Sequence, residues 1–237
     1  MDLREIEELS RLIAPYFNRR IRYGKDILPP PIIVEFLGTP DSGKTTLKEE
    51  CDKFFKSLGF RNFPPQEGAE AVRYIKRSTP FYNVATGLYA FNILMNVSEG
   101  HQYDFVFFDR CVFDTYTWMK YWFKIGKLSQ ETMIMLQGAF LAGAPRVDLA
   151  LMMLCNPEVA VARNNKNETL SRPGSWTNVE KISFLAECNR ESHEELKDRF
   201  SQLVIMDTTD MDEKTMVHKG LEMIMNVVRK KIIAPAS

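Results

Sequence analysis

The sequence has little of the chemistry that marks metal-binding, disulfide-linked or membrane-spanning proteins. Its 237 residues include 4 cysteines and 3 histidines, which are scattered along the chain without a C-x-x-C pair. The cysteines are therefore expected to be reduced, packed side chains rather than a metal site or a disulfide framework. No apolar run approaches the length of a membrane span, and the acidic, amphipathic N-terminus is unlike a secretion signal. We expect a cytoplasmic location and no membrane partner.

An excess of charge of either sign is also missing. Lys and Arg together number 31, and Asp and Glu together also number 31. This balance argues against a strongly basic surface for nucleic-acid backbones, so any basic site must be local. There is no internal repeat or low-complexity tract, and 45% of the residues are hydrophobic, which fits one α/β domain with a sizeable core.

The most informative segment that is present is the glycine-bounded loop G-x-x-x-x-G-K-T at residues 38–45. An apolar, β-branched run at 32–37 precedes it, and helical periodicity over 44–58 follows it. In a strand–loop–helix setting, consecutive backbone N–H groups and a helix N-terminus bind phosphate. The residues expected to bind a nucleotide are Gly38, Thr39, Pro40, Asp41, Ser42, Gly43, Lys44, Thr45 and Thr46.

Two residues of this loop have more specific expected roles. Lys44 should reach the β- and γ-phosphates of ATP, and the Thr45 hydroxyl should ligate Mg²⁺. The alternative is a glycine-rich turn that only joins a strand to a helix, and the flanking pattern disfavours it.

Apolar strands alternate with helices along the rest of the chain. Strands are predicted at 32–37, 60–63, 105–108, 147–154 and 203–206. Helices are predicted at 2–20, 44–58, 69–77, 82–97, 113–124, 129–142, from Pro157 onward, at 179–200 and at 212–231. This pattern predicts a three-layer P-loop NTPase fold, with a five-stranded parallel sheet and helices on both faces. Residues 1–28 read as an N-terminal helical extension, and 29–237 as the P-loop domain.

Ligands of such sheets gather at the carboxyl ends of the strands, which selects Glu67, Asp109, Arg110 and Asn156 as neighbours of the loop. Asp109 ends an apolar strand and suits Mg²⁺ or its bound water, although it could instead cap the following helix. Arg110 offers a planar fork for a phosphate. Glu67 suits a general base if the acceptor is a hydroxyl, whereas a phosphate acceptor needs arginine clamps more than a base. The alternative is that Glu67 is a surface residue at a helix start, where the helix dipole favours it.

A polar segment, 164–178, is predicted to be a mobile loop, with a lid near 163–178. Arg163, Lys166 and Arg172 could close over the donor phosphates, neutralise charge and exclude water. The alternative is an exposed loop whose charges only keep the protein in solution.

These pieces together resemble the P-loop kinases of the thymidylate kinase and deoxynucleoside kinase group. The matching segments are 36–46, 66–68, 108–110 and 154–163, and the resemblance covers roughly 32–230. It implies that Glu67 faces the acceptor, that Arg110 contacts the acceptor or the transferred phosphate, and that Arg163 and Arg172 contact donor phosphates. It also allows Arg73 to face an acceptor phosphate. Aromatic surface for a base could come from Phe81, Tyr82, Tyr89, Phe91, Tyr116 and Trp118, most of which are expected in the core.

The function that follows is Mg-ATP-dependent transfer of the γ-phosphoryl group to a nucleoside or nucleoside monophosphate. ATP and Mg²⁺ are the expected cofactors, and a small-molecule acceptor is the expected partner. The resemblance also allows a homodimer. One alternative is a nucleotide-dependent regulatory ATPase that uses the N-terminal helix as its output surface. Another is a kinase of polynucleotide ends, which the neutral charge disfavours.

Overall fold

The computed structural model describes residues 2–23, 31–100, 102–166 and 178–233. Its centre is a five-stranded parallel sheet in the order β2-β3-β1-β4-β5. The strands are β1 (Ile32–Gly38), β2 (Asn62–Phe63), β3 (Phe105–Asp109), β4 (Leu149–Leu154) and β5 (Leu203–Asp207). Strand β1 is therefore central, and the loop that follows it lies between the ends of β3 and β4.

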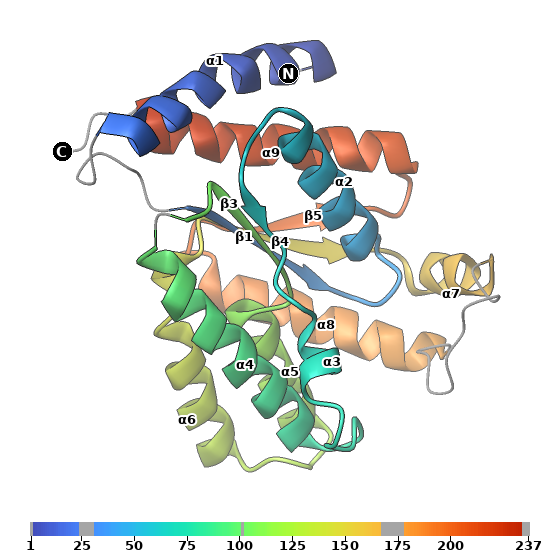
Figure 1. Ribbon diagram of the computed structural model, residues 1–237. Coiled ribbons are helices and arrows are strands. Elements are labelled where there is room, and N and C mark those ends of the chain that lie inside the picture. Colours follow the sequence, from blue (N-terminus) through green and yellow to red (C-terminus); the bar gives the residue numbers. More distant parts are fainter. Residues whose placement is uncertain (1, 24–30, 101, 167–177, 234–237) are drawn as a thin grey trace.

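Helices cover both faces of this sheet (Figure 1). One face carries α1 (Leu3–Tyr23), α2 (Lys44–Ser57) and α9 (Glu213–Ile233). The other face carries α4 (Pro80–Ser98), α5 (Val112–Lys124), α6 (Gln130–Leu141) and α8 (Val179–Leu196). The short elements α3 (Gly68–Ala71) and η2 (Ala144–Arg146) and the helix α7 (Pro157–Lys166) complete the set. The predicted three-layer parallel architecture is confirmed.

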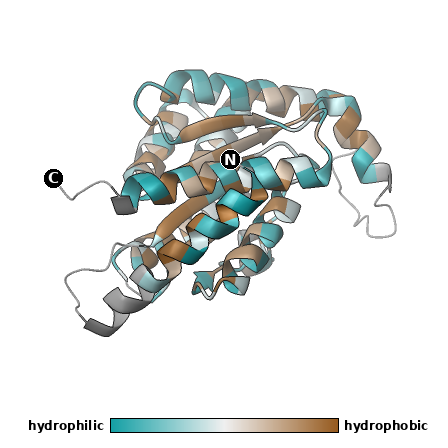
Figure 2. Ribbon diagram, turned by 90° about the horizontal axis from the view of Figure 1, so that it is seen from above, coloured by the Kyte–Doolittle hydropathy of each residue, from teal (hydrophilic) through white to brown (hydrophobic). Residues whose placement is uncertain are grey.

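Alternation along the strands builds two cores. In β1, Ile32, Val34 and Phe36 pack toward α1, α2 and α9, while Ile33 and Leu37 pack toward α4, α5 and α8. Both sets are buried, which is why the strand reads as a nearly continuous apolar run. Figure 2 shows the brown strands of the sheet lying between helices that carry teal, hydrophilic residues.

The helix predicted at 69–77 is wrong beyond its first turn. Only Gly68–Ala71 is helical, and the chain then passes through turns to Pro80, which begins α4. Residues 68–77 are all exposed or half-buried. Because most helical stability in proteins comes from packing an apolar face, a segment without a buried face has little to keep it helical. The other predicted elements differ from the structure mainly at their ends.

The N-terminal helix α1 packs on α9. Ile6 and Ile13 are buried in the same core as α9, and the Ser10 hydroxyl lies 3.4 Å from the Met225 sulfur. None of the described helices combines the length and apolar character needed to cross a membrane.

Candidate active site

The loop after β1 is shaped by three residues with positive φ. Gly38 has φ 119°, Asp41 has φ 54° and Gly43 has φ 92°. A Cβ at Gly38 would lie 2.0 Å from the Met153 carbonyl oxygen, so only glycine fits there. Gly43 is the N-cap of α2 and supplies no side-chain cap. The first N–H groups of α2 are thus left to an incoming anion.

Lys44 is folded back over this loop. Its side chain is buried, and its ammonium donates to the Thr39 carbonyl and lies 3.3 Å from the Ser42 hydroxyl. Burial lowers the pKa of Lys44 to about 8, with Arg110 acting in the same direction and nearby carboxylates opposing it. A bound phosphate would supply the counter-charge that this buried cation needs.

Thr45 and Asp109 meet where the loop and β3 come together. The Thr45 hydroxyl lies 3.2 Å from Asp109 Oδ2, and the Lys48 ammonium lies 3.6 Å from the same oxygen. Hydroxyl and carboxylate oxygens are the ligands that Mg²⁺ prefers, so these two residues fit the metal. Lys48 lies one helical turn beyond Lys44, and no sequence pattern singled it out.

A first pocket, of about 360 Å³, opens over the loop. Its lining residues are Asp41, Gly43, Lys44, Thr45, Thr46, Arg163, Met211, Glu213 and Met216. The Thr208 hydroxyl, just beyond β5, donates to the Ser42 carbonyl at 3.0 Å and so joins this part of the chain to the loop.

Arg163 reaches this pocket from α7. Its guanidinium donates to the carbonyls of Thr208 at 2.7 Å, Met211 at 3.3 Å and Thr209 at 3.5 Å. Arg163 therefore braces the segment between β5 and α9 beside the loop. Arg172, and most of the lid predicted near 163–178, lie outside the described residues. The Asn156 side chain accepts from the Glu158 N–H at 2.8 Å, and Asn156 does not line either pocket.

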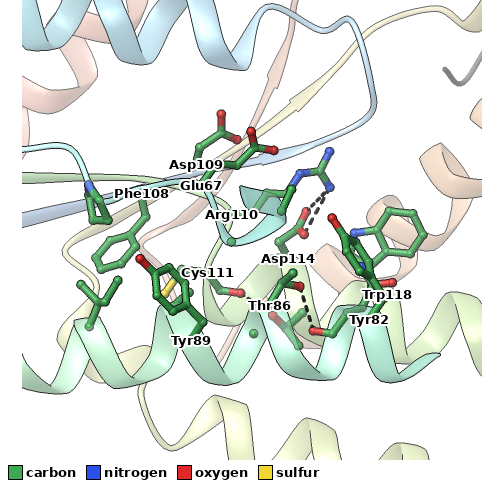
Figure 3. A pocket seen from close by; sticks show the side chains of 18 of the residues that line it. Glu67, Tyr82, Thr86, Tyr89, Phe108, Asp109, Arg110, Cys111, Asp114 and Trp118 are labelled. Atoms are coloured by element: carbon green, nitrogen blue, oxygen red, sulfur yellow. Dashed lines mark hydrogen bonds and ion pairs between the residues drawn. The ribbon is translucent and has the colours of Figure 1, made fainter. Parts of the chain in front are cut away.

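A second pocket, of about 260 Å³, lies on the other side of Asp109. Figure 3 shows Glu67, Asp109 and Arg110 above, with Tyr82, Thr86 and Tyr89 of α4 below them. Glu67 is the N-cap of α3, yet its side chain makes no capping hydrogen bond. The aromatic side chains in the lining are Tyr82, Tyr89, Phe108, Trp118 and Trp122.

Arg110 has an unusual backbone and a fixed side chain. Its φ is 68°, its N–H donates to the Phe36 carbonyl at 2.9 Å, and its Nη1 donates to both Asp114 oxygens at 3.1 and 3.3 Å. The guanidinium lies 6.0 Å from the Trp118 ring centre. Burial raises the pKa of Asp114 above its ordinary value, although Arg110 opposes this.

Sequence reasoning missed two charged residues of this second pocket, Asp114 and Arg77. Asp114 follows Arg110 by four residues, which is the helical spacing of an ion pair and was a usable signal. Arg77 lines the pocket with its guanidinium 5.7 Å from the Tyr82 ring centre. Arg73 is exposed and donates to the Glu70 carbonyl at 3.1 Å.

The aromatic candidates divide between the pocket and other places. Tyr82, Tyr89 and Trp118 line the pocket, and Phe81 is exposed. The ring centres of Phe91 and Phe140 lie 6.4 Å apart, and the Tyr116 hydroxyl donates to Glu195 at 2.9 Å. Neither Phe91 nor Tyr116 lines the pocket.

Comparison with known proteins gives matches among solved structures. No protein-family model matches the chain, and no curated protein matches it. Deoxyadenosine kinase from M. mycoides with bound dCTP aligns over 84% of this chain and 100% of its own, at 16% identity and a TM-score of 0.52. The same kinase with the products dCMP and dCDP gives 16% identity and a TM-score of 0.55, over the same shares of the two chains. The structure with bound dATP gives 17% identity and a TM-score of 0.55, over 84% of this chain and 99% of its own. The chain therefore has the P-loop NTPase fold in the form found in these deoxynucleoside kinases, as its sequence predicted.

Proposed function

We propose that the protein is a P-loop kinase that transfers the γ-phosphoryl group of Mg-ATP to a nucleoside or nucleoside monophosphate. The observation that carries this proposal is the junction of the two pockets. Thr45 of the loop pocket lies 3.2 Å from Asp109 of the second pocket. A phosphate donor in one pocket and an acceptor in the other would therefore meet beside these two residues.

The donor side depends on the loop. Its N–H groups and Lys44 would hold the β- and γ-phosphates, and Thr45 and Asp109 would hold Mg²⁺. The metal, when bound, neutralises charge on the phosphate oxygens. Arg163 braces the segment that forms the pocket wall, and we propose that it and Arg172 stabilise the donor, with 163–178 as the lid. Since little covalent chemistry falls to the protein, these residues would act by positioning and electrostatics.

The acceptor side depends on Glu67 and Arg110. Glu67 would orient an acceptor hydroxyl or take its proton, and Arg110 would stabilise the phosphoryl group in transit. The aromatic rings of Tyr82, Tyr89 and Trp118 suit a flat base. The deoxyadenosine kinase structures with dATP, dCTP and dCMP support a nucleoside or nucleotide as the acceptor class.

The test is a mass-spectrometric assay with Mg-ATP and a panel of nucleosides, nucleoside monophosphates and short oligonucleotides. We expect one panel member of the first two classes to gain the mass of one phosphate, and the Lys44→Met variant to produce none. ATP hydrolysis without any acceptor product would instead indicate a regulatory ATPase. Phosphate gain on oligonucleotides alone would indicate a kinase of polynucleotide ends.

A cytoplasmic location and the division of the chain into an extension at 1–28 and a P-loop domain at 29–237 also stay predictions.

We further propose that a second copy covers α4 and α6, which lie on the outer side of the molecule (Figure 1). None of the 19 residues of α4 is charged, and α6 carries no charge after its first turn. Leu88, Ile134 and Met135 are exposed there. Large apolar side chains exposed on helices with almost no charge are typical of a surface that packs against a partner. Light scattering should report a dimer, and Ile134→Glu should convert it to a monomer. A wild-type monomer at micromolar concentration would contradict this.

A further inference from the structure

Glu35 is the one acidic residue within the apolar run of the central strand β1. Its side chain is fully buried and lies on the same face of β1 as Ile33 and Leu37, toward α5. A buried carboxylate is costly unless hydrogen-bond donors surround it. Such a residue in a central strand therefore calls for a specific partner.

The partner of Glu35 is the N-terminus of α5. Its Oε1 accepts from the N–H groups of Cys111 at 2.8 Å and Asp114 at 2.9 Å, and its Oε2 accepts from Phe113 at 3.2 Å. Cys111, the N-cap residue of α5, makes no capping hydrogen bond with its own side chain. A neighbouring strand thus supplies the cap that the local sequence lacks, at the positive end of the helix.

Strand β1 therefore holds the turn between β3 and α5 at two successive residues. The Phe36 carbonyl accepts from the Arg110 N–H at 2.9 Å. The Glu35 carboxylate accepts from the N–H groups of Cys111, Phe113 and Asp114. Arg110 lies between these contacts with φ 68°, a backbone conformation that a non-glycine residue adopts only when its surroundings enforce it.

We propose that Glu35 is a positioning residue for catalysis, acting through the Asp109–Arg110 turn and the first turn of α5; this rests on the function proposed above. Asp109, Arg110 and Asp114 all line the acceptor pocket. A shift or rotation of the α5 N-terminus would move these groups together, away from the donor site. Transfer should depend on their placement more steeply than nucleotide binding does, because most of the groups proposed to hold the donor, namely the loop N–H groups, Lys44 and Thr45, lie outside this turn.

A matched control is available near the first residues of β1, at the end of the strand away from the pockets. Asp148 is also a carboxylate that accepts from a backbone N–H of β1, that of Ile33 at 2.8 Å, and it pairs with Lys231 at 2.8 Å. It does not line the acceptor pocket. Asp148→Asn should perturb stability without touching the turn.

The test compares Glu35→Gln, Glu35→Leu and Asp148→Asn with the wild type. The steady-state kcat and KM would be measured with the acceptor that the panel identifies, and calorimetry would measure Mg-ADP affinity. Glutamine keeps an oxygen for Cys111 and Asp114 but turns an amide toward the Phe113 N–H, so it should lower kcat about tenfold. Leucine should lower kcat about a hundredfold. Mg-ADP affinity should stay within about twofold in both, and Asp148→Asn should leave kcat unchanged.

Equal kcat in Glu35→Gln and Asp148→Asn, or a parallel loss of Mg-ADP affinity, would overturn the proposal. If Glu35→Leu does not fold, Glu35→Gln decides alone. Hydrogen exchange provides a readout that does not need turnover: Glu35→Gln should speed exchange at 109–114 and leave 38–46 unchanged. If the wild type phosphorylates no panel member, the proposed function fails. Exchange then decides whether Glu35 holds the turn, and unchanged exchange at 109–114 counts against it.

Discussion

The Thr45 hydroxyl and the Asp109 carboxylate lie 3.2 Å apart, so the loop after β1 and the end of β3 meet at one point. Asp109→Asn removes the negative charge at this point. We expect turnover to fall by about 10²-fold and half-maximal activity to require more Mg²⁺. A magnesium titration of the rate measures both effects. Asp52→Asn, which changes a carboxylate paired with Lys56 elsewhere on α2, serves as control. An unchanged magnesium requirement would rule out Asp109 as a ligand.

Lys44→Met should abolish turnover with little loss of fold. The methionine replaces a buried cation with an apolar chain of similar length, so the thermal unfolding midpoint should hold while phosphate binding is lost. Differential scanning calorimetry and a turnover assay measure the two properties. Lys53→Met, on the exposed side of α2, is the matched control. Full activity in Lys44→Met would show that the loop does not hold the donor.

Arg163→Lys separates two roles of the α7 arginine. Lysine keeps the charge but not the planar fork that reaches the carbonyls of Thr208 and Met211. If bracing is the main role, the variant should lose about 1–3 kcal/mol of unfolding free energy and bind Mg-ADP more weakly. Urea unfolding and calorimetry measure these changes. Unaltered stability would assign Arg163 to charge alone.

Glu35→Gln should change how stability depends on pH. Burial is the main reason why the pKa of Glu35 rises from 4.5 to about 7; the charge of Asp114 adds to it, and the three backbone N–H groups oppose it. Between these values the folded state holds a proton that the unfolded state has lost. The resulting stability is complete below pH 4.5 and disappears as pH rises through 7.

Urea unfolding of the two proteins from pH 4.5 to 8 checks this. The wild type should lose roughly 3 kcal/mol relative to Glu35→Gln across the window and then level off. Parallel curves would mean that Glu35 stays ionised in the folded protein over this whole range, as it does in the unfolded chain. The Asp114 carboxylate and the Cys111 thiol lie close enough to Glu35 to affect its titration. Cys111→Ser should therefore be measured beside the wild type at each pH, as the control that removes the thiol.

Local pattern alone was enough to predict the strands and most of the helices. Strands β1, β3 and β4 are nearly unbroken apolar runs because both faces of a parallel sheet are buried, and such a run is visible among neighbouring residues. The loop at 38–45 is equally local, since the positive φ of Gly38 and Gly43 is a demand that glycine meets. The likeness to deoxynucleoside kinases followed from these short segments and is confirmed for the fold.

The strand ends pointed to Glu67, Asp109 and Arg110, but only the tertiary structure decided which other side chains share the second pocket. Arg77, Thr86 and Trp122 come from separate segments, and no short pattern relates them. In the sequence, Glu35 is a single acidic residue within an apolar strand, and nothing near it in the chain indicates a partner. Its hydrogen bonds to α5 form only because β3 pairs with β1 and places the start of α5 beside it. Sequence periodicity records burial and backbone preference residue by residue. A site depends on which elements become neighbours, and the strand order, set by packing across the whole chain, determines that.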